Sequence, residues 1–278
     1  MSFGDDYEHL SITTEGRAVW ATIDNPPINL ITRELLVDLL RFSERAAADP
    51  NSTVVVIQSA NPDFFIAHFD VALLQREPGK APPRPTELNA FDEMIERFRT
   101  MPKATICKIA GRVGGGGSEL AMGCDMRFAA RGCAVMNQME VPIGIIPGGG
   151  GTQRLPGLVG HSRAAELILG GLDLDAVTGE AWGYFNRALP PEDLDAYVDG
   201  LARRVASFDP DAVRGAKHSL LRAQVEPTDG LIDETHIFNT LQASDSAQQL
   251  LQRFLELGGQ TPAGELRMED LAAEIAES

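Results

Sequence analysis

Residues 114–117 are four consecutive glycines, and this run constrains the fold more than any other feature of the sequence. An apolar strand candidate at residues 104–110 leads into it, and residues 118–122 after it have the pattern of a helix start. Glycine is required where the backbone takes a positive φ or lies against a ligand. The first amides of a helix have no partner inside the helix and lie at the positive end of its dipole. The junction is therefore either a flexible turn or a site for an anion or a developing oxyanion.

Other glycine-loop chemistries do not fit this run. A phosphate-binding P-loop requires Gly-Lys followed by Ser or Thr, but Lys80 is followed by Ala81. A hydrolase elbow requires a glycine two residues after its serine, but Leu120 stands there after Ser118. The dinucleotide fingerprint follows the first strand of its domain, and this run comes too late in the chain.

The composition excludes several classes of protein. The 278 residues are 44% hydrophobic and 23% charged, which is typical of a globular chain. Acidic residues outnumber basic ones by 40 to 24, and this net charge of −16 argues against general binding of nucleic acids or anionic membranes. No apolar run approaches the ~18–20 residues that cross a bilayer, and the N-terminus lacks a signal pattern, so we expect a cytoplasmic location. The three cysteines (an odd number) and the five histidines lack ligand spacing, so we expect reduced thiols and no metal.

Strand and helix patterns alternate in the first part of the chain, and helical spacing dominates from about Ser162 onward. Predicted strands lie at residues 8–13, 19–23, 53–58, 104–110, 125–129 and 134–137, and predicted helices at 33–48, 87–99, 118–122, 162–169, 175–182, 191–207, 210–224, 230–256 and 265–277. The first two strands read as a hairpin, and a proline-rich loop is expected at 77–86. We therefore predict an α/β core over residues 1–190 and a helical C-terminal region over 191–278.

Two acids near the glycine runs are candidates for proton transfer. Glu119 directly follows the first run, where an acid is also an ordinary helix-start preference. Glu140 lies among apolar residues between two predicted elements, where it is either a solvated surface acid or a functional one. Two carboxylates beside one oxyanion site would suit proton transfer on and off a carbon skeleton, with water between them.

Four stretches of the chain together resemble the enoyl-CoA hydratase/isomerase (crotonase) family. Residues 25–29 (NPPIN) resemble the loop after the family's first hairpin, and residues 64–71 (FFIAHFDV) resemble its F-x-A-G-A-D-[LI] segment. Residues 111–125 (GRVGGGGSELAMGCD) resemble its G-x-a-x-G-G-G-x-E-L-x-x-x-C-D segment. Residues 140–155 (EVPIGIIPGGGGTQRL) resemble its E-x-x-x-G-x-x-P-x-x-G-[GS]-x-x-R-L segment, and the last two stretches at this spacing are specific.

The resemblance implies a fold and a reaction. The family fold is an α/β spiral of two roughly perpendicular sheets wrapped by helices, with a helical C-terminal region that assembles homotrimers or hexamers and forms part of the acyl pocket. The substrate is an acyl-CoA, and no metal or redox cofactor is required. Because both family glutamates are present, we expect hydration of a trans-2-enoyl-CoA to a 3-hydroxyacyl-CoA. Isomerase, C–C lyase or thioester hydrolase chemistry and a catalytically weak CoA-thioester-binding protein remain alternatives.

The motifs also imply roles for individual residues. The oxyanion hole is expected from the backbone N–H groups of Phe69 and Gly116, with Glu119 and Glu140 as the two catalytic glutamates. Gly116 is expected not to tolerate a side chain, whereas Gly114, at the edge of the run, is expected to be more tolerant. Further contacts with the CoA thioester are expected from Pro27, Ala67, His68, Asp70, Val71 and Gly115.

The chain departs from the family pattern at two places. His68 and Phe69 stand where the family usually has glycine and alanine, and this bulky pair is expected to reshape the acyl pocket or to strain the loop. His68 is interpreted as a packing or solvent-facing residue, because a lone histidine seldom becomes catalytic without positioned partners. The alternative is an additional acid–base or pH-sensitive group. Residues 245–257 replace the family's small-residue E-G-x-x-A-F segment, which changes the CoA contacts expected from these helices.

Overall fold

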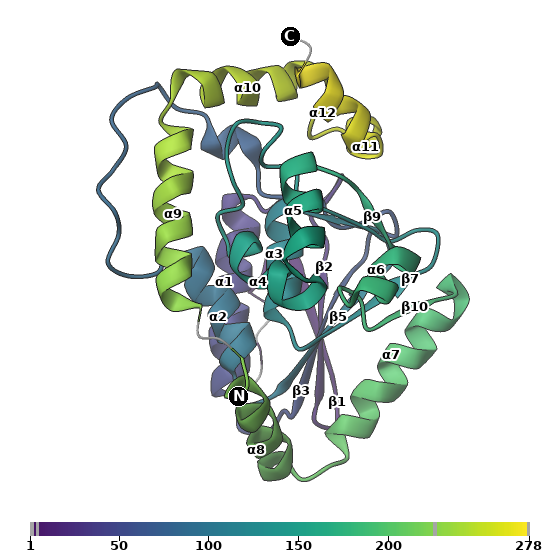
Figure 1. Ribbon diagram of the computed structural model, residues 1–278. Helices are drawn as coiled ribbons and strands as arrows, with labels where there is room; N and C mark the ends of the chain where they lie inside the picture. The colour runs from purple at the N-terminus through teal and green to yellow at the C-terminus, as the bar shows by residue number, and fades with distance from the viewer. Residues whose placement is uncertain (1–2, 4–5, 225–226, 277–278) are drawn as a thin grey trace.

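The computed structural model describes residues 3, 6–224 and 227–276. Its strands form two sheets (Figure 1). The larger sheet has the strand order β1 (Leu10–Glu15), β2 (Ala18–Ile23), β3 (Val54–Ser59), β5 (Ala104–Ile109), β7 (Met126–Ala130) and β10 (Arg187–Leu189). The smaller sheet has the order β4 (Phe64–Ile66), β6 (Arg112–Gly114), β8 (Val135–Asn137) and β9 (Leu174–Asp175).

The larger sheet combines one hairpin with parallel strands. The strands β1 and β2 pair antiparallel, with Glu15 opposite Ala18 across the predicted turn. The next strands, β3, β5, β7 and β10, each run parallel to their neighbours. Parallel strands need crossover segments, which cover both faces of the sheet. The β3 strand is accordingly a β-branched run in which Val54, Val55 and Val56 are fully buried.

Helices surround both sheets, as the resemblance implies. In the first part of the chain these are α1 (Arg33–Ala48), the short 3₁₀ helix η1 (Val71–Leu74), α2 (Ala90–Thr100), α3 (Gly115–Gly123), α4 (Gly151–Val159), α5 (His161–Gly170) and α6 (Ala176–Trp182). They are followed by α7 (Pro191–Ala206), α8 (Pro210–Leu221), α9 (Thr228–Gln242), α10 (Asp245–Glu256), α11 (Pro262–Glu265) and α12 (Met268–Ala276). Within the described ranges, no helix combines the length and apolar composition that crossing a bilayer requires.

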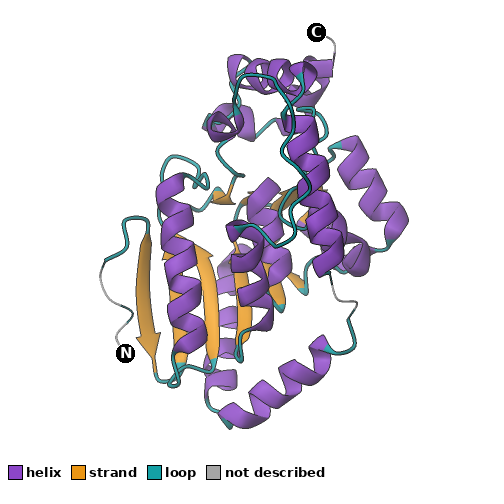
Figure 2. Ribbon diagram, turned by 90° about the vertical axis from the view of Figure 1, so that its left-hand side faces the viewer, coloured by secondary structure: helices purple, strands orange, loops and turns teal. Residues whose placement is uncertain are grey.

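The two faces of the larger sheet pack against different helices. One face packs with α1 and α2 through residues such as Leu39 and Phe98, which are fully buried. The other face, which includes Trp20, packs against Leu194 and Val198 of α7. In Figure 2 the strands of this sheet lie side by side, with helices crossing in front of them. The apolar face of α7 is therefore buried within the chain itself.

The C-terminal helices form a third apolar cluster beyond the two sheet faces. Leu251 and Phe254 of α10 and Leu271 of α12 pack there with Ile143 and Ile145, which follow β8. Figure 1 shows α10, α11 and α12 together at one end of the molecule, with α9 leading to them. The C-terminal region thus covers segments from the first half of the chain.

Some boundaries differ from those that the sequence pattern predicts. The predicted helix at 230–256 is two helices, because Ser244 accepts a hydrogen bond from the Ala247 amide and caps α10. The predicted helix at 265–277 is also two, α11 and α12, and its last residue lies outside the described residues. The pattern misses α4, which carries Pro156 inside it. The first glycine run does not simply precede a helix, since α3 already begins at Gly115.

Candidate active site

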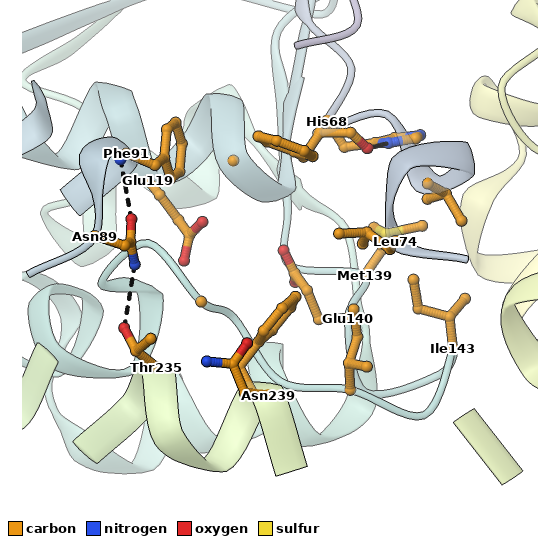
Figure 3. Close-up of a pocket in the computed structure, with 16 residues that line it drawn as sticks. His68, Leu74, Asn89, Phe91, Glu119, Met139, Glu140, Ile143, Thr235 and Asn239 are labelled. Carbon is orange, nitrogen blue, oxygen red and sulfur yellow. Dashed lines mark hydrogen bonds between the residues drawn. The ribbon is translucent and has the colours of Figure 1, made fainter. Parts of the chain in front are cut away.

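A cavity of about 260 Å³ lies between the two glycine runs and α9. Its wall is mostly apolar, and Figure 3 shows the carboxylate ends of Glu119 and Glu140 pointing into it. The cavity wall contains six of the residues predicted from the sequence, namely His68, Phe69, Val71, Gly116, Glu119 and Glu140. The C-terminal region contributes Thr235, Phe238 and Asn239 from α9.

Phe69 and Gly116, the two residues of the predicted oxyanion hole, are neighbours in this wall. The carbonyl of His68 accepts a hydrogen bond of 2.9 Å from the Ile31 N–H. A trans peptide directs its C=O and N–H to opposite sides, so the Phe69 N–H points away from Ile31. Gly116 is the second residue of α3, where an N–H has no partner inside the helix. A Cβ at Gly116 would lie 3.6 Å from the Cβ of Phe69, so the two residues are direct neighbours.

The glycine run also permits close packing behind the cavity. A Cβ at Gly114 would lie 2.4 Å from the carbonyl oxygen of Ala67, and a backbone atom cannot move aside cheaply. The expectation that Gly114 only relieves the turn and is more tolerant than Gly116 is therefore wrong, because the nearest atom to a Cβ at Gly116 is a side-chain atom at 3.2 Å. Gly115 has φ +43°, and a Cβ there would lie 2.9 Å from the Cβ of His68 and 3.0 Å from Oε1 of Glu140. The run is a tightly packed helix start and not a flexible connector.

Glu119 is a buried acid, not a surface acid at a helix start. Its side chain lies in α3, and only 3% of the residue is exposed. Its Oε1 accepts hydrogen bonds of 2.7 Å from Gly149 N–H and 2.9 Å from Gly151 N–H. Burial raises the pKa of Glu119, while these two N–H groups and the charge of Arg154 act in the opposite direction. Two backbone N–H groups of the second glycine run therefore hold the Glu119 carboxylate.

Glu140 is buried as well, but in a different environment. It follows β8, and no described group forms a hydrogen bond with its Oε2 atom. Burial raises the pKa of Glu140 well above its usual range, and the negative charges of Glu119 and Glu234 raise it further. Glu140 therefore holds a proton more strongly than an ordinary glutamate and is not a solvated surface acid.

Glu234 is a buried acid that the sequence pattern does not distinguish from a surface acid. It lies on α9, and its two oxygens accept hydrogen bonds of 2.6 Å from Gly150 N–H and 2.8 Å from Thr152 N–H. The Thr152 hydroxyl donates a further hydrogen bond to it. Burial, followed by the charge of Glu119, raises the pKa of Glu234 to about 8. No local signal marks this residue, because it is one acid among several in a predicted helix.

A polar cluster at the start of α2 adds a fourth buried carboxylate. Asn89 caps this helix by accepting a hydrogen bond of 2.9 Å from Phe91 N–H, and its amide lies 3.2 Å from the Thr235 hydroxyl (Figure 3). Asn89 and Thr235 both donate to the Asp92 carboxylate, at 2.6 and 3.1 Å. Burial, and then the charge of Glu119, raises the pKa of Asp92 to about 7. The cavity thus lies in a strongly acidic but desolvated part of the core.

Four of the predicted contact residues lie outside the cavity wall. Pro27 is exposed, and its carbonyl accepts a hydrogen bond of 2.8 Å from the Asn61 amide. Ala67 is buried among apolar side chains, and Gly115 packs behind the wall as described above. Asp70 caps η1 by accepting a hydrogen bond from Ala72 N–H. A role of these residues in binding CoA stays a prediction.

His68 lies in the cavity wall and is 2% exposed, so it is a buried residue and not a solvent-facing one. It is not isolated, however. Its Nε2 lies 3.0 Å from Oε1 of Glu265 on α11, and its ring meets the Phe254 ring edge-on at 5.8 Å. Sequence spacing gives no signal for this pair, because its members are 197 residues apart.

Known proteins with similar sequences support the resemblance drawn from the four motifs. The sequence profile of the enoyl-CoA hydratase/isomerase family matches residues 14–261. The 2,3-dehydroadipyl-CoA hydratase of Escherichia coli K12 is 30% identical over 249 residues, which cover 89% of this chain and 95% of that protein. The enoyl-CoA isomerase/hydratase fer4 of Mycosarcoma maydis is 32% identical over 242 residues, which cover 84% of this chain and 87% of that protein.

Solved structures match the whole fold. A crystal structure of a Streptomyces avermitilis protein matches with a TM-score of 0.88 and 38% identity, covering 98% of this chain and all of that one. The enoyl-CoA hydratase of Bacillus anthracis matches with a TM-score of 0.70 and 28% identity, covering 90% of this chain and 96% of that one. The expected crotonase fold is confirmed. The chain belongs to the enoyl-CoA hydratase/isomerase family.

Proposed function

We propose that this protein hydrates trans-2-enoyl-CoA thioesters to 3-hydroxyacyl-CoA. The observation that carries the proposal is the pairing of two buried glutamates in unlike environments beside two adjacent backbone amides. Glu119 accepts two N–H hydrogen bonds, whereas one oxygen of Glu140 has no partner among the described groups. Hydrogen bonds from N–H groups favour a charged carboxylate, and their absence in a buried place favours a protonated one.

The proposed reaction moves two protons and forms two bonds. The thioester carbonyl accepts hydrogen bonds from the N–H groups of Phe69 and Gly116, which stabilise the enolate as it develops. Glu119 takes a proton from a water molecule, and the water oxygen forms a bond with Cβ. The electron pair of the double bond moves toward the carbonyl, and Glu140 then gives its proton to Cα. Glu119 then releases its proton and Glu140 regains one through the solvent, which restores the starting state. The sum is the addition of one water with no net oxidation or reduction, so no redox cofactor is needed.

The assignment of one glutamate as general base and the other as general acid follows from their surroundings. A general base must be ionised and a general acid must be protonated at the working pH. Glu119 is the better base, because Gly149 and Gly151 stabilise its charge. Glu140 is the better acid, because burial and the charge of Glu119 keep its proton on. Neighbouring carboxylates whose environments push their pKa values apart are suited to such a pair of roles.

The substrate enters a mostly apolar cavity, which suits an acyl chain better than a charged group. The proposal includes coenzyme A as part of the substrate and no metal. It also includes assembly into a homotrimer or hexamer, as the family resemblance implies. Sedimentation equilibrium at micromolar concentration tests the assembly, and a clean monomer would contradict it.

Double-bond isomerisation is a second candidate. The same oxyanion site and carboxylates can move a proton between Cα and Cγ without adding water. The relative fer4 is named for both reactions at 32% identity, so the likeness does not separate them. C–C lyase and thioester hydrolase chemistry, and binding without turnover, are further outcomes of the same assay.

The deciding experiment compares turnover with binding. Crotonyl-CoA and 3-enoyl-CoA esters of several chain lengths are offered to the purified protein, and acetoacetyl-CoA is titrated as a binding probe. The proposal expects water addition to the 2-enoyl esters. Isomerisation of the 3-enoyl esters without hydration would favour the second candidate, and tight binding without turnover would favour a binding protein.

A further inference from the structure

The loop that carries the Phe69 amide is joined to the C-terminal end of the chain by two polar contacts. This oxyanion loop comprises residues 67–70. Nε2 of His68 lies 3.0 Å from Oε1 of Glu265. The side-chain amide of Gln260 donates a hydrogen bond of 2.7 Å to the Asp70 carboxylate. Both contacts connect segments about 190 residues apart in the sequence.

The surroundings of the His68 ring fix its protonation. Its Nδ1 lies 2.7 Å from the carbonyl oxygen of Phe69, which can only accept, so Nδ1 carries a proton. Its Nε2 faces a carboxylate oxygen that already accepts a hydrogen bond of 2.8 Å from Gln260 N–H. With acceptors on both sides, the ring is satisfied as an imidazolium beside an ionised Glu265.

The charges of the two groups are mutually stabilised. Burial acts to lower the pKa of His68, but the charge and hydrogen bond of Glu265, together with the Phe69 carbonyl and the charge of Asp70, outweigh it and raise that pKa. Burial acts to raise the pKa of Glu265, but the charge and hydrogen bond of His68, together with the Gln260 N–H and the charge of Arg112, outweigh it and lower that pKa. Each group is only 2% exposed, so loss of either partner leaves an uncompensated charge in the core.

The two peptide units that flank Phe69 are both held by hydrogen bonds, one of them from the His68 ring. The unit before Phe69 is held by Ile31, whose N–H donates to the His68 carbonyl. The unit after it is held by the His68 ring, which donates to the Phe69 carbonyl. Phe69 therefore lies between one peptide unit held by a bond within the core and one held by a bond that depends on the His68–Glu265 contact.

We propose that His68 and Glu265 form a positioning pair for the oxyanion hole, through which α11 holds the Phe69 amide toward the cavity. The inference rests on the proposed function of that amide. The histidine at position 68, where the family usually has glycine, then positions the loop and acts neither as an acid–base group nor as a mere packing residue. It also makes the C-terminal segment part of the active site without any contact to the reacting atoms.

The test uses Glu265→Gln, His68→Gln and the double variant, with Glu265→Asp as the conservative change. Glu269→Gln is the matched control, because Glu269 is an exposed glutamate of α12 that accepts a hydrogen bond from Asp173 N–H outside the cavity. The first readout is the infrared C=O stretch of bound, isotope-labelled butyryl-CoA, which has the thioester but no double bond to hydrate. The second readout is kcat and KM with crotonyl-CoA.

We expect the carbonyl frequency shift on binding to be about twofold smaller in the single variants, since a misaligned donor polarises the thioester less. Their kcat should fall about tenfold with KM within about twofold, which is less than the loss of a whole oxyanion donor. The double variant should be no worse than the poorer single variant, because the two groups act as one unit. Glu265→Asp should lie between Glu265→Gln and the wild type, and Glu269→Gln should match the wild type.

An unchanged carbonyl shift in folded Glu265→Gln would overturn the proposal, even if activity fell. Equal losses in Glu265→Asp and Glu265→Gln would also overturn it, since retention of the charge would then not matter. If His68→Gln does not fold, the two Glu265 variants decide the question. If the wild type shifts the butyryl-CoA carbonyl but does not hydrate crotonyl-CoA, the proposed hydration fails while the positioning pair is still tested by the shift.

Discussion

Glu119 and Glu234 divide four successive backbone amides between them. Glu119 accepts the N–H groups of Gly149 and Gly151, and Glu234 accepts those of Gly150 and Thr152. The two carboxylates come from α3 and α9 and hold the start of α4 from two sides. Acids at a helix start are stabilised by its unpaired amides and dipole. The loop that positions Glu119 is therefore itself positioned by the C-terminal region.

The first prediction concerns Glu234, the second carboxylate that accepts hydrogen bonds from the start of α4. In Glu234→Gln, the amide NH₂ must face one of the two backbone N–H groups, which leaves a buried donor unpaired. The free energy of unfolding should fall by about 1–3 kcal/mol, the usual cost of one unsatisfied buried group. The kcat should fall about tenfold, because Glu119 is held less firmly.

Asp233→Asn provides the control. Asp233 precedes Glu234 but is exposed and pairs with Arg84 on the surface, so its loss should cost at most about 1 kcal/mol. Chemical denaturation and steady-state kinetics measure both variants. Equal effects at positions 233 and 234 would mean that Glu234 does not support the loop.

The second prediction concerns the two glutamates in the cavity. Glu119→Gln and Glu140→Gln should each lower kcat by about 10²–10⁴, the usual range for a positioned acid or base. The affinity for acetoacetyl-CoA, measured by titration calorimetry, should change little. A variant that retains wild-type hydration would remove that glutamate from the mechanism.

The third prediction concerns pH. Burial, reinforced by the charge of Glu119, raises the pKa of Glu140. As the pH rises through that value, Glu140 loses the proton that it must donate, so kcat should fall on the alkaline side. In Glu140→Gln the small remaining rate should lack this alkaline decline. An identical alkaline decline in wild type and variant would assign it to another group.

The sequence predicts the two glutamates of the cavity but not the hydrogen bonds by which the second glycine run holds one of them. The family pattern points to Glu119 and Glu140, but it does not reveal that Gly149 and Gly151 donate to Glu119. Neither Glu234 nor Glu265 has a local pattern that distinguishes it from a surface acid of an amphipathic helix. Thr152, which donates to Glu234, lies 82 residues away, and His68, which contacts Glu265, lies 197 residues away, so only the tertiary fold identifies these contacts.

The larger elements were predictable because they are long and periodic. Thr32 at the start of α1 and the β-branched run of β3 are strong local signals, and both predictions are confirmed. The strands β4, β6, β9 and β10 have only two or three residues, which is too short for an alternating pattern to show. Gly114 was misjudged because the sequence does not show that the Ala67 carbonyl lies against it.

The fourth prediction compares Gly116, in the cavity wall, with Gly200, where a side chain has open space. A Cβ at Gly116 would lie 3.2 Å from Ile31 and 3.3 Å from Phe91, so the larger side chain in Gly116→Val must intrude on the cavity. We expect kcat to fall about 10²–10³-fold, comparable to the loss of one oxyanion donor. Gly200→Val is the control, because Gly200 lies in α7 with open space around it.

Circular dichroism checks that both glycine variants fold, and initial rates with crotonyl-CoA give the comparison. Gly200→Val should keep wild-type activity. Equal, mild effects at the two positions would show that Gly116 does not form part of the site.

The most direct test of the central claim follows the oxygen atom of the added water. The wild-type protein is incubated with crotonyl-CoA in water labelled with heavy oxygen, and the products are analysed by mass spectrometry, with Glu119→Gln as the inactive reference. We expect 3-hydroxybutyryl-CoA that carries the label on its hydroxyl group, with formation much slower in the variant. Recovery of unlabelled substrate, of an ester with a shifted double bond, or of a free labelled acid would contradict it.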